Sequence, residues 1–298
     1  VIVDATNVQR GRGESLESFN SKLTHLQLQG RRLGPDLRRL DLVQQVYVLY
    51  AYDNLISSLA GIEHAKRLQM LYLQNNRLTS MAGLEGLTHL KKLHLGHNRL
   101  VRIEHLDHCA NLEELYVPHQ RPPASEVPLE FCPTSMAAIA GRLRVLDAAG
   151  NRLEDCWNLS PLKRLVSFDL CDNAFQQVAD LRELLMGPFL TKVSLTGNPF
   201  ESQNRKATYR TAVVLGSQSI EEIDGRPVLA QERDFVKRLD EQKRKLKAQR
   251  SRLANRGYAE GGAGAAAPVS KDKVYEPGDR KGPGRIFAPP VIQDLVQW

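Results

Sequence analysis

Residues 68–106, LQMLYLQNNRLTSMAGLEGLTHLKKLHLGHNRLVRIEHL, contain one pattern twice, with a period of 22 residues. The pattern is LxxLxLxxNxLxxIxxLxxL, in which apolar residues and one Asn recur at fixed places. Its positions in the first copy are Leu68, Leu71, Leu73, Asn76, Leu78, Met81, Leu84 and Leu87. Its positions in the second copy are Leu90, Leu93, Leu95, Asn98, Leu100, Ile103, Leu106 and Cys109. A fixed period of this length indicates a repeat architecture.

Each half of the repeat predicts its own local structure. Alternating apolar residues such as Leu71 and Leu73 indicate a short strand with one buried face. Asn76 follows where the chain turns, and its amide can satisfy backbone groups that the turn leaves unpaired. Apolar residues at every third position of the second half suit a tight helical turn. Because only neighbouring units can cover each apolar side, we predict an α/β leucine-rich repeat solenoid, or horseshoe, with a concave parallel sheet.

The pattern extends in both directions and predicts eight strand units over residues 21–200. The first unit is degenerate, as terminal repeats commonly are, and has Arg31 where Asn is expected. In the later units, the Asn position of the pattern is occupied by Asn54, Asn76, Asn98, Gln120, Asn151, Asn173 and Asn198. The step from Gln120 to Asn151 is 31 residues. We therefore predict a Pro-rich insertion within about 121–141 that loops out of the convex side or the solenoid edge.

The segments outside the repeats predict a flank, a cap and an extension. Residues 1–20 form the N-terminal flank, with a short helix that begins at Ser15. Residues 201–229 contain an amphipathic stretch and an Asp-Gly turn, which predict a C-terminal cap over the open apolar end. Residues 230–256 contain no Gly or Pro and predict a charged helix. Leu239, Leu246 and Leu253 form a thin heptad seam, which suits a coiled coil and a solvated helix equally.

The C-terminal segments differ from the repeats in composition. Residues 257–270 are rich in Gly and Ala and predict a flexible linker. Residues 271–298 are rich in Pro and Gly but end in an apolar cluster that a disordered tail does not need. We predict that this tail docks on a partner or on the solenoid. Its docking residues are Ile286, Phe287, Ile292, Leu295 and Trp298.

The positive charge of the chain lies in the predicted charged helix. Residues 237–256 contain nine Lys or Arg against two acidic residues, a balance of +7 that equals the formal net charge of the whole chain. We expect this basic extension to bind an acidic surface. Its main residues are Lys237, Arg238, Lys243, Arg244, Lys245, Lys247 and Arg250.

Cysteine usage and hydropathy indicate a cytosolic type of compartment. The four cysteines show no CxxC spacing, and Cys109 and Cys156 replace apolar residues at core positions. We therefore predict reduced, buried thiols rather than disulfides. No apolar run approaches 18 residues, so we expect no membrane segment.

Strand alternation places a row of aromatic and polar side chains on the concave face. The predicted partner-binding residues are Tyr50, Tyr52, Tyr72, Gln74, His94, His97, Tyr116, His119, Asp147 and Asp169. Four of the eight tyrosines would then form one exposed patch on three neighbouring strands. Exposed Tyr beside His is typical of a protein-binding hot spot. The alternative is that these rings only stack on one another as strand formers.

The acidic and histidine residues of this face do not indicate an enzyme. Asp147, Asp169 and Asp172 lie without a neighbouring nucleophile or a Gly-rich phosphate loop, which favours a solvated acidic patch over acid-base chemistry. An open sheet gives His94, His97 and His119 no enclosing geometry for a metal ion. We predict no catalytic residue, no metal and no cofactor.

Residues 164–168, RLVSF, match a loose form of the short motif that binds the catalytic subunit of protein phosphatase 1. Leu165 and Phe168 are repeat core positions, whereas a docking motif must be extended and free. We interpret the match as accidental.

Several segments together resemble one family of leucine-rich repeat proteins. They are LYLQNNRL, KKLHLGHNRL, SLTGNPF and ELYVPHQRPP with the insertion that follows it, and they are similar to the protein phosphatase 1 regulatory subunit 42 family of testis leucine-rich repeat proteins. The resemblance covers about residues 20–236 and continues more weakly into the tail. It implies an association with centrosomes, cilia and flagella, with tubulin and with the phosphatase catalytic subunit.

We therefore expect a noncatalytic adaptor of the ciliary or flagellar axoneme, basal body or centrosome. Its concave face would bind a protein segment, and its basic extension would bind an acidic surface such as the tails of tubulin in microtubules. One alternative is a targeting subunit of protein phosphatase 1. Another is a scaffold in an RNA-protein complex, which the lack of an aromatic residue between Val236 and Gly257 makes the weaker one.

Overall fold

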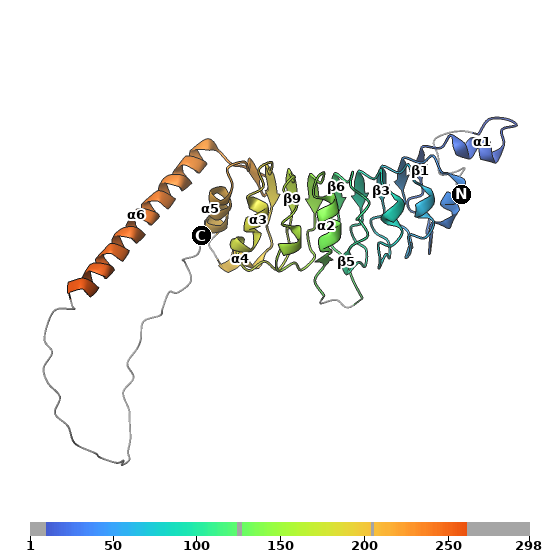
Figure 1. Cartoon of the computed structure of the whole chain (residues 1–298). Coiled ribbons are helices and arrows are strands. Elements are labelled where there is room, and N and C mark those ends of the chain that lie inside the picture. The colour runs from blue at the N-terminus through green and yellow to red at the C-terminus, as the bar shows by residue number, and fades with distance from the viewer. Residues whose placement is uncertain (1–9, 124–126, 204–205, 261–298) are drawn as a thin grey trace, which may run out of the picture. The chain divides into compact units, whose positions relative to one another are not determined.

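A computed structural model describes residues 10–123, 127–203 and 206–260. The chain divides into two compact units, Val1–Lys237 and Arg238–Trp298. In the first unit, the repeats follow one another in a single row (Figure 1). The predicted linker beyond Glu260 and the predicted tail, with Ile286, Phe287, Ile292, Leu295 and Trp298, lie outside the described residues.

Eight short parallel strands, one from each repeat, form the main sheet, as the sequence predicts. Their register is constant, so that Leu49, Leu71, Leu93 and Leu115 are direct neighbours. The strands are β1 (His25–Gln27), β2 (Val48–Tyr50), β3 (Met70–Tyr72), β4 (Lys92–His94), β6 (Glu114–Tyr116), β8 (Val145–Asp147), β9 (Ser167–Asp169) and β10 (Lys192–Ser194).

Buried side-chain amides connect the repeats at the turn after each strand. Asn98 Nδ2 donates to the carbonyl of Leu95 in its own turn and to that of Leu73 in the preceding repeat, both at 2.9 Å. Its Oδ1 accepts from the backbone N–H of Leu78 at 3.0 Å. Asn54, Asn76, Asn151, Asn173 and Asn198 are buried at equivalent places, and Gln120 replaces Asn there with the same bonds. The amides thus satisfy the backbone groups that the turns leave inside.

Helical turns form the opposite side of the solenoid, because the apolar residues there recur every three positions. Turns of successive repeats contact one another. The 3-10 turns are η2 (Arg38–Leu42), η3 (Ile62–His64), η4 (Leu84–Gly86), η5 (Trp157–Leu159) and η6 (Val178–Leu181). The α-helices of this side are α2 (Pro133–Ile139) and α3 (Arg182–Leu185).

The insertion after Gln120 differs in part from the predicted loop. Its described second half forms β7 (Glu130–Phe131), which pairs in parallel with β5 (Arg102–Ile103). The helix α2 follows, and its Met136 and Ile139 are buried in the core. The prediction that the insertion loops out of the solenoid was therefore wrong for residues 130–139, because the apolar residues of this segment pack on the core.

Helices close the two ends of the first unit. At the N-terminal end, α1 (Leu16–Ser21) begins after Ser15, whose hydroxyl accepts from the N–H of Ser18, and buries Phe19. At the other end lie α4 (Pro199–Gln203) and α5 (Lys206–Gly216). Two further strands extend the sheet there, β11 (Glu222–Ile223) in parallel to β10 and β12 (Arg226–Pro227) antiparallel to β11. The sequence predicted the cap helix and the turn but not these strands.

The helix α6 (Ala230–Glu260) contains the predicted charged segment. It continues to Glu260, so the predicted linker was wrong for residues 257–260. The first turns contact the cap, where Arg233 donates to the carbonyls of Ser217 and Ile220 at 2.8 and 2.6 Å. Leu246 of the predicted heptad seam is exposed.

Candidate functional site

The candidate site is the open face of the ten-stranded sheet, which corresponds to the predicted concave face and is called the sheet face below. The middle residue of each repeat strand, such as Leu71 or Leu93, is fully buried in the core. The residues on either side point to the open face because side chains alternate along a strand. This alternation places the third residue of each strand, such as Tyr72, on the sheet face with partial burial.

Four rings from four adjacent strands form one continuous stack, here called the ring ladder: Tyr50, Tyr72, His94 and Tyr116. Neighbouring ring centroids are 4.9 Å apart for Tyr50 and Tyr72, and 4.8 Å apart for Tyr72 and His94. The centroids of His94 and Tyr116 are 3.9 Å apart, with the planes inclined by only 4°. This spacing follows from the distance of about 4.8 Å between neighbouring strands. The rings therefore stack face to face with little adjustment of their side chains.

A charged pair flanks the ring ladder. Lys92 Nζ and Glu114 Oε2 are 2.6 Å apart, and Lys92 Nζ lies 5.1 Å from the centroid of Tyr116. The hydroxyl of Tyr116 donates to Glu114 Oε2 at 2.8 Å. The opposite charges of Lys92 and Glu114 thus neutralise each other beside the ring ladder.

Partial burial changes the acid-base properties of the ring ladder. Burial lowers the pKa of His94 from 6.5 to about 4, with a further contribution from nearby Lys92. Burial also raises the pKa values of Tyr72 and Tyr116, and the hydrogen bond to Glu114 adds to the rise at Tyr116. At neutral pH the ladder is therefore uncharged and presents an apolar surface with polar edges.

A second pair of stacked rings lies where the chain leaves β4 and β6. His97 and His119 have ring centroids 5.1 Å apart and positive φ angles of 56° and 53°. Asp53, Asn75 and Asp172 occupy equivalent positions with φ near 55°. Burial and the neighbouring His119 lower the pKa of His97. Tyr52 and Gln74, two further predicted residues, are half-buried at the ends of β2 and β3.

The other half of the sheet face is acidic. Asp147 and Asp169 continue the ring ladder on β8 and β9 and are half-buried. Each carboxylate accepts from the backbone N–H two residues later, Ala149 at 3.2 Å and Cys171 at 2.9 Å. Burial raises the pKa of Asp147, and the negative charge of Asp169 adds to the rise. The predicted solvated acidic patch is thus more buried than expected.

The structure brings the predicted sheet-face residues together but changes two details. The aromatic patch covers four strands, not three, because β4 contributes His94 between the tyrosines. The rings are half-buried by mutual stacking rather than wholly exposed. Stacking, the simpler alternative, is present, and it leaves each of the four rings only partly buried.

The other predicted features occur outside the sheet face. The basic residues Lys237, Arg238, Lys243, Arg244, Lys245, Lys247 and Arg250 are all exposed on α6. Leu165 and Phe168 of the RLVSF segment are buried, which agrees with an accidental match. Cys109 and Cys156 are free thiols in the core, as predicted.

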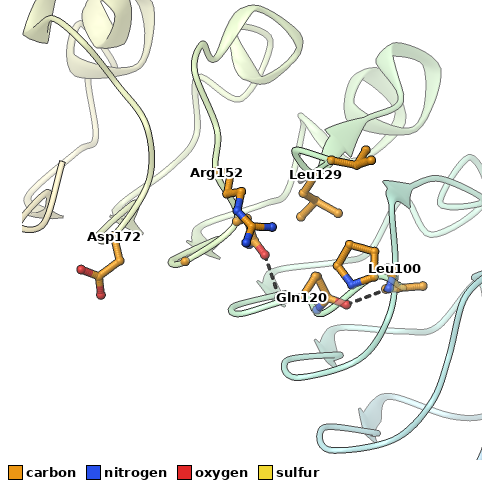
Figure 2. A pocket seen from close by; sticks show the side chains of 9 residues that line it. Leu100, Gln120, Leu129, Arg152 and Asp172 are labelled. Carbon is orange, nitrogen blue, oxygen red and sulfur yellow. Dashed lines mark hydrogen bonds between the residues drawn. The ribbon is translucent and has the colours of Figure 1, made fainter. Parts of the chain in front are cut away.

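Sequence reasoning missed a small pocket beside the insertion (Figure 2). Its volume is about 190 Å³, and its lining includes Gln120, Leu129 and Arg152. It forms because the chain leaves the regular repeat after Gln120 and returns at Leu129. The 31-residue step between Gln120 and Asn151 was the signal for this irregularity.

Two further features bear on the function. Among the described residues, no group of three or more His, Cys, Asp or Glu side chains is arranged to hold a metal ion. No helix in this part of the chain is long and apolar enough to cross a bilayer.

Comparison with known proteins agrees with the repeat architecture. A family model described as "Leucine Rich repeats (2 copies)" matches residues 66–108, the stretch that contains the regular repeats. A leucine-rich repeat protein structure from Leptospira interrogans is similar with a TM-score of 0.55 and 20% identity, over 70% of this chain and 50% of that chain. The internalin C2 structure from Listeria monocytogenes is similar with a TM-score of 0.50 and 20% identity, over 61% of this chain and 75% of that chain. The chain has the fold of a leucine-rich repeat solenoid.

Proposed function

We propose that the chain is a noncatalytic adaptor that binds a protein segment on its sheet face. The observation that carries this proposal is the ring ladder of Tyr50, Tyr72, His94 and Tyr116, an uncharged aromatic surface on an open sheet. Stacking fixes these rings before binding, so little side-chain entropy is lost when a partner covers them. Tyr side chains also offer polar tips for hydrogen bonds at the edge of the contact.

We further propose that the partners belong to the axoneme of a cilium or flagellum, or to the basal body or centrosome, in the cytoskeleton. The resemblance to the protein phosphatase 1 regulatory subunit 42 family supports this location. The basic residues of α6 support a second contact with an acidic surface such as tubulin, because they are exposed along the helix. Arg244 forms one ion pair within the helix, with Asp240 at 2.6 Å.

A pull-down from detergent-extracted cilia tests the adaptor function. The intact chain is compared with Tyr50→Ala/Tyr72→Ala/Tyr116→Ala, which removes three rings of the ladder. The matched control is Trp157→Ala, because Trp157 is a 75% exposed aromatic residue on η5. We expect the control to recover axonemal proteins and the triple variant to lose them while its circular dichroism is unchanged. Equal recovery by all three chains would show that the sheet face is not the binding site.

A targeting subunit of protein phosphatase 1 is the second candidate function, supported by the same resemblance. Residues 164–168 are unsuited to docking, since Ser167 and Phe168 belong to β9 and Leu165 is buried. Phosphatase binding would then use the sheet face. Co-purification of the catalytic subunit with the intact chain and its loss with the triple Tyr variant is the expected result for this function.

A scaffold in an RNA-protein complex is the third candidate, supported by the exposed Lys and Arg residues of α6. Such binding would consist of phosphate contacts and would weaken steeply with salt. A gel-shift titration with single-stranded RNA at two salt concentrations distinguishes it from the adaptor function, for which no RNA binding is expected at physiological salt.

A further inference from the structure

The two halves of the sheet face differ in how their charges are balanced. On the aromatic half, Glu114 is paired with Lys92 at 2.6 Å. On the acidic half, Asp147, Asp169 and Asp172 belong to two adjacent repeats. None of the three forms an ion pair with Lys or Arg in the part of the chain that the structure describes. The charges beside the ring ladder at Lys92 and Glu114 are therefore balanced, whereas the continuation of this column at Asp147 and Asp169 is negatively charged.

The carboxylates of the acidic half are held in fixed directions. The backbone N–H of Ala149 donates to Asp147, and that of Cys171 donates to Asp169. Both side chains lie in the same column as the ring ladder, because β8 and β9 continue the register of β6. The acidic half is a direct continuation of the aromatic surface along one line.

We infer that the occupant of the sheet face is a polypeptide segment of fixed polarity, with apolar side chains on the ring ladder and Lys or Arg on Asp147 and Asp169. This inference rests on the proposed function and specifies the chemistry of its partner. Cationic side chains complement the unpaired carboxylates and relieve the repulsion between them. Apolar side chains cover the stacked rings, which are neutral at physiological pH.

The spacing of the strands sets the distance between the two halves of the partner segment. Four strand steps separate Tyr72 on β3 from Asp169 on β9, which corresponds to about 20 Å. An extended peptide spans this distance in about six residues. An α-helix spans it in about 13 residues. A peptide of 16 residues is therefore long enough to show the polarity in either conformation.

Selection from a phage-displayed library of random 16-residue peptides tests the inference with three full-length targets. They are the intact chain, Asp147→Asn/Asp169→Asn, and the Tyr50→Ala/Tyr72→Ala/Tyr116→Ala variant. Asn keeps the size of Asp and an oxygen that can accept the local backbone bond. All three targets carry the same α6, so peptides that bind its basic residues appear in every selection and are discounted.

We expect the intact chain to enrich peptides with an aromatic or aliphatic cluster at one end and Lys or Arg at the other. The Asp variant should enrich the apolar cluster without the basic residues. An enriched peptide should bind the Asp variant about tenfold more weakly in fluorescence anisotropy. The matched control Glu130→Gln/Glu154→Gln, which neutralises two exposed carboxylates outside the sheet face, should bind it as tightly as the intact chain.

The outcomes separate this inference from the proposed function. If the intact chain and the Asp variant enrich apolar peptides equally and without basic residues, the inferred charge polarity of the bound segment is wrong. The sheet face would then still be supported as the binding site. If the triple Tyr variant enriches the same peptides as the intact chain, the proposed function itself is wrong. Circular dichroism of each variant confirms that it is folded before the comparison is made.

Discussion

At the residue scale, the buried amides hold each repeat to the one before it. Asn98 has 1% of its surface exposed and bonds to backbone groups of two successive repeats. Replacement of such a group leaves several buried donors and acceptors without partners, and water cannot reach them to compensate. Each of these buried amides therefore contributes to the interface between repeats as well as to its own turn.

We predict that Asn98→Ala lowers the free energy of unfolding by about 2–4 kcal/mol, because buried groups of Leu73, Leu78 and Leu95 lose their partner. Urea unfolding followed by circular dichroism measures this change. Arg99→Ala is the matched control, since Arg99 is exposed beside it, and should shift the stability by less than about 0.5 kcal/mol. A change of less than about 0.5 kcal/mol for Asn98→Ala would contradict a stabilising role of the buried amides.

His94 makes stability depend on pH. Its pKa is about 4 in the folded chain against 6.5 for an ordinary His. Between these values the unfolded chain binds more protons than the folded chain, so the free energy of unfolding falls as pH decreases from about 7 towards 4. Urea midpoints at pH 7 and pH 5 measure this loss. His94→Tyr keeps a ring in the stack without this titration, and we expect a smaller difference between the two midpoints.

At the scale of elements, Arg210 is one of two arginines in the described part of the chain that bond the cap to the first turns of α6; the other is Arg233. Arg210 of α5 contacts both carboxylate oxygens of Glu232 at 2.6 and 2.9 Å, and it donates to the carbonyls of Ile223 and Pro227. The pairing with Glu232 raises the pKa of Arg210, and the same pairing lowers the pKa of Glu232. A two-point ion pair of this kind holds Glu232, in the first turn of α6, against α5.

We predict that Arg210→Ala lowers the free energy of unfolding by about 1–3 kcal/mol, because Glu232 and two carbonyl groups lose their donor. Hydrogen-deuterium exchange of residues 230–236 should become faster, while exchange in the central repeats stays unchanged. Arg226→Ala replaces an exposed arginine of β12 and serves as the control. Unaltered exchange at 230–236 in the Arg210 variant would show that other contacts hold the helix.

The sequence predicted the regular elements well and the irregular ones poorly, for a physical reason. The strands and the amides from Asn54 to Asn198 follow from a period that neighbouring units impose on one another. The strand β7 and the helix α2 of the insertion have no such period, and their place depends on where Phe131 and Met136 find space in the core. The row that contains His94 between two tyrosines and the possibility of stacking follow from strand alternation, whereas the close parallel contact of His94 with Tyr116 is shown only by the structure.

At the scale of the whole molecule, two kinds of surface belong to one chain. The sheet face is aromatic in one half and acidic in the other, whereas α6 is exposed and strongly basic. The two surfaces suit partners of different chemistry, since one favours desolvated side-chain contacts and the other favours long-range attraction that salt screens. The two interactions should therefore respond to different substitutions and to different salt concentrations.

We predict that Lys243→Gln/Arg244→Gln/Lys245→Gln/Lys247→Gln abolishes co-sedimentation with microtubules at low salt and leaves peptide binding on the sheet face unchanged. The triple Tyr variant should show the opposite result. Microtubules whose acidic tubulin tails have been removed by limited proteolysis should bind the intact chain weakly. Undiminished binding to such microtubules would contradict an electrostatic role for α6.

The strand β12 forms one edge of the main sheet, and its Pro227 lacks a backbone N–H. Val228 donates inward to the carbonyl of Glu221 at 2.7 Å, so the nitrogen of Pro227 lies on the outer edge, where proline has no hydrogen to donate. A strand of another molecule would find an incomplete set of donors there. Pro227 therefore disfavours the addition of a strand from another molecule at this edge of the sheet.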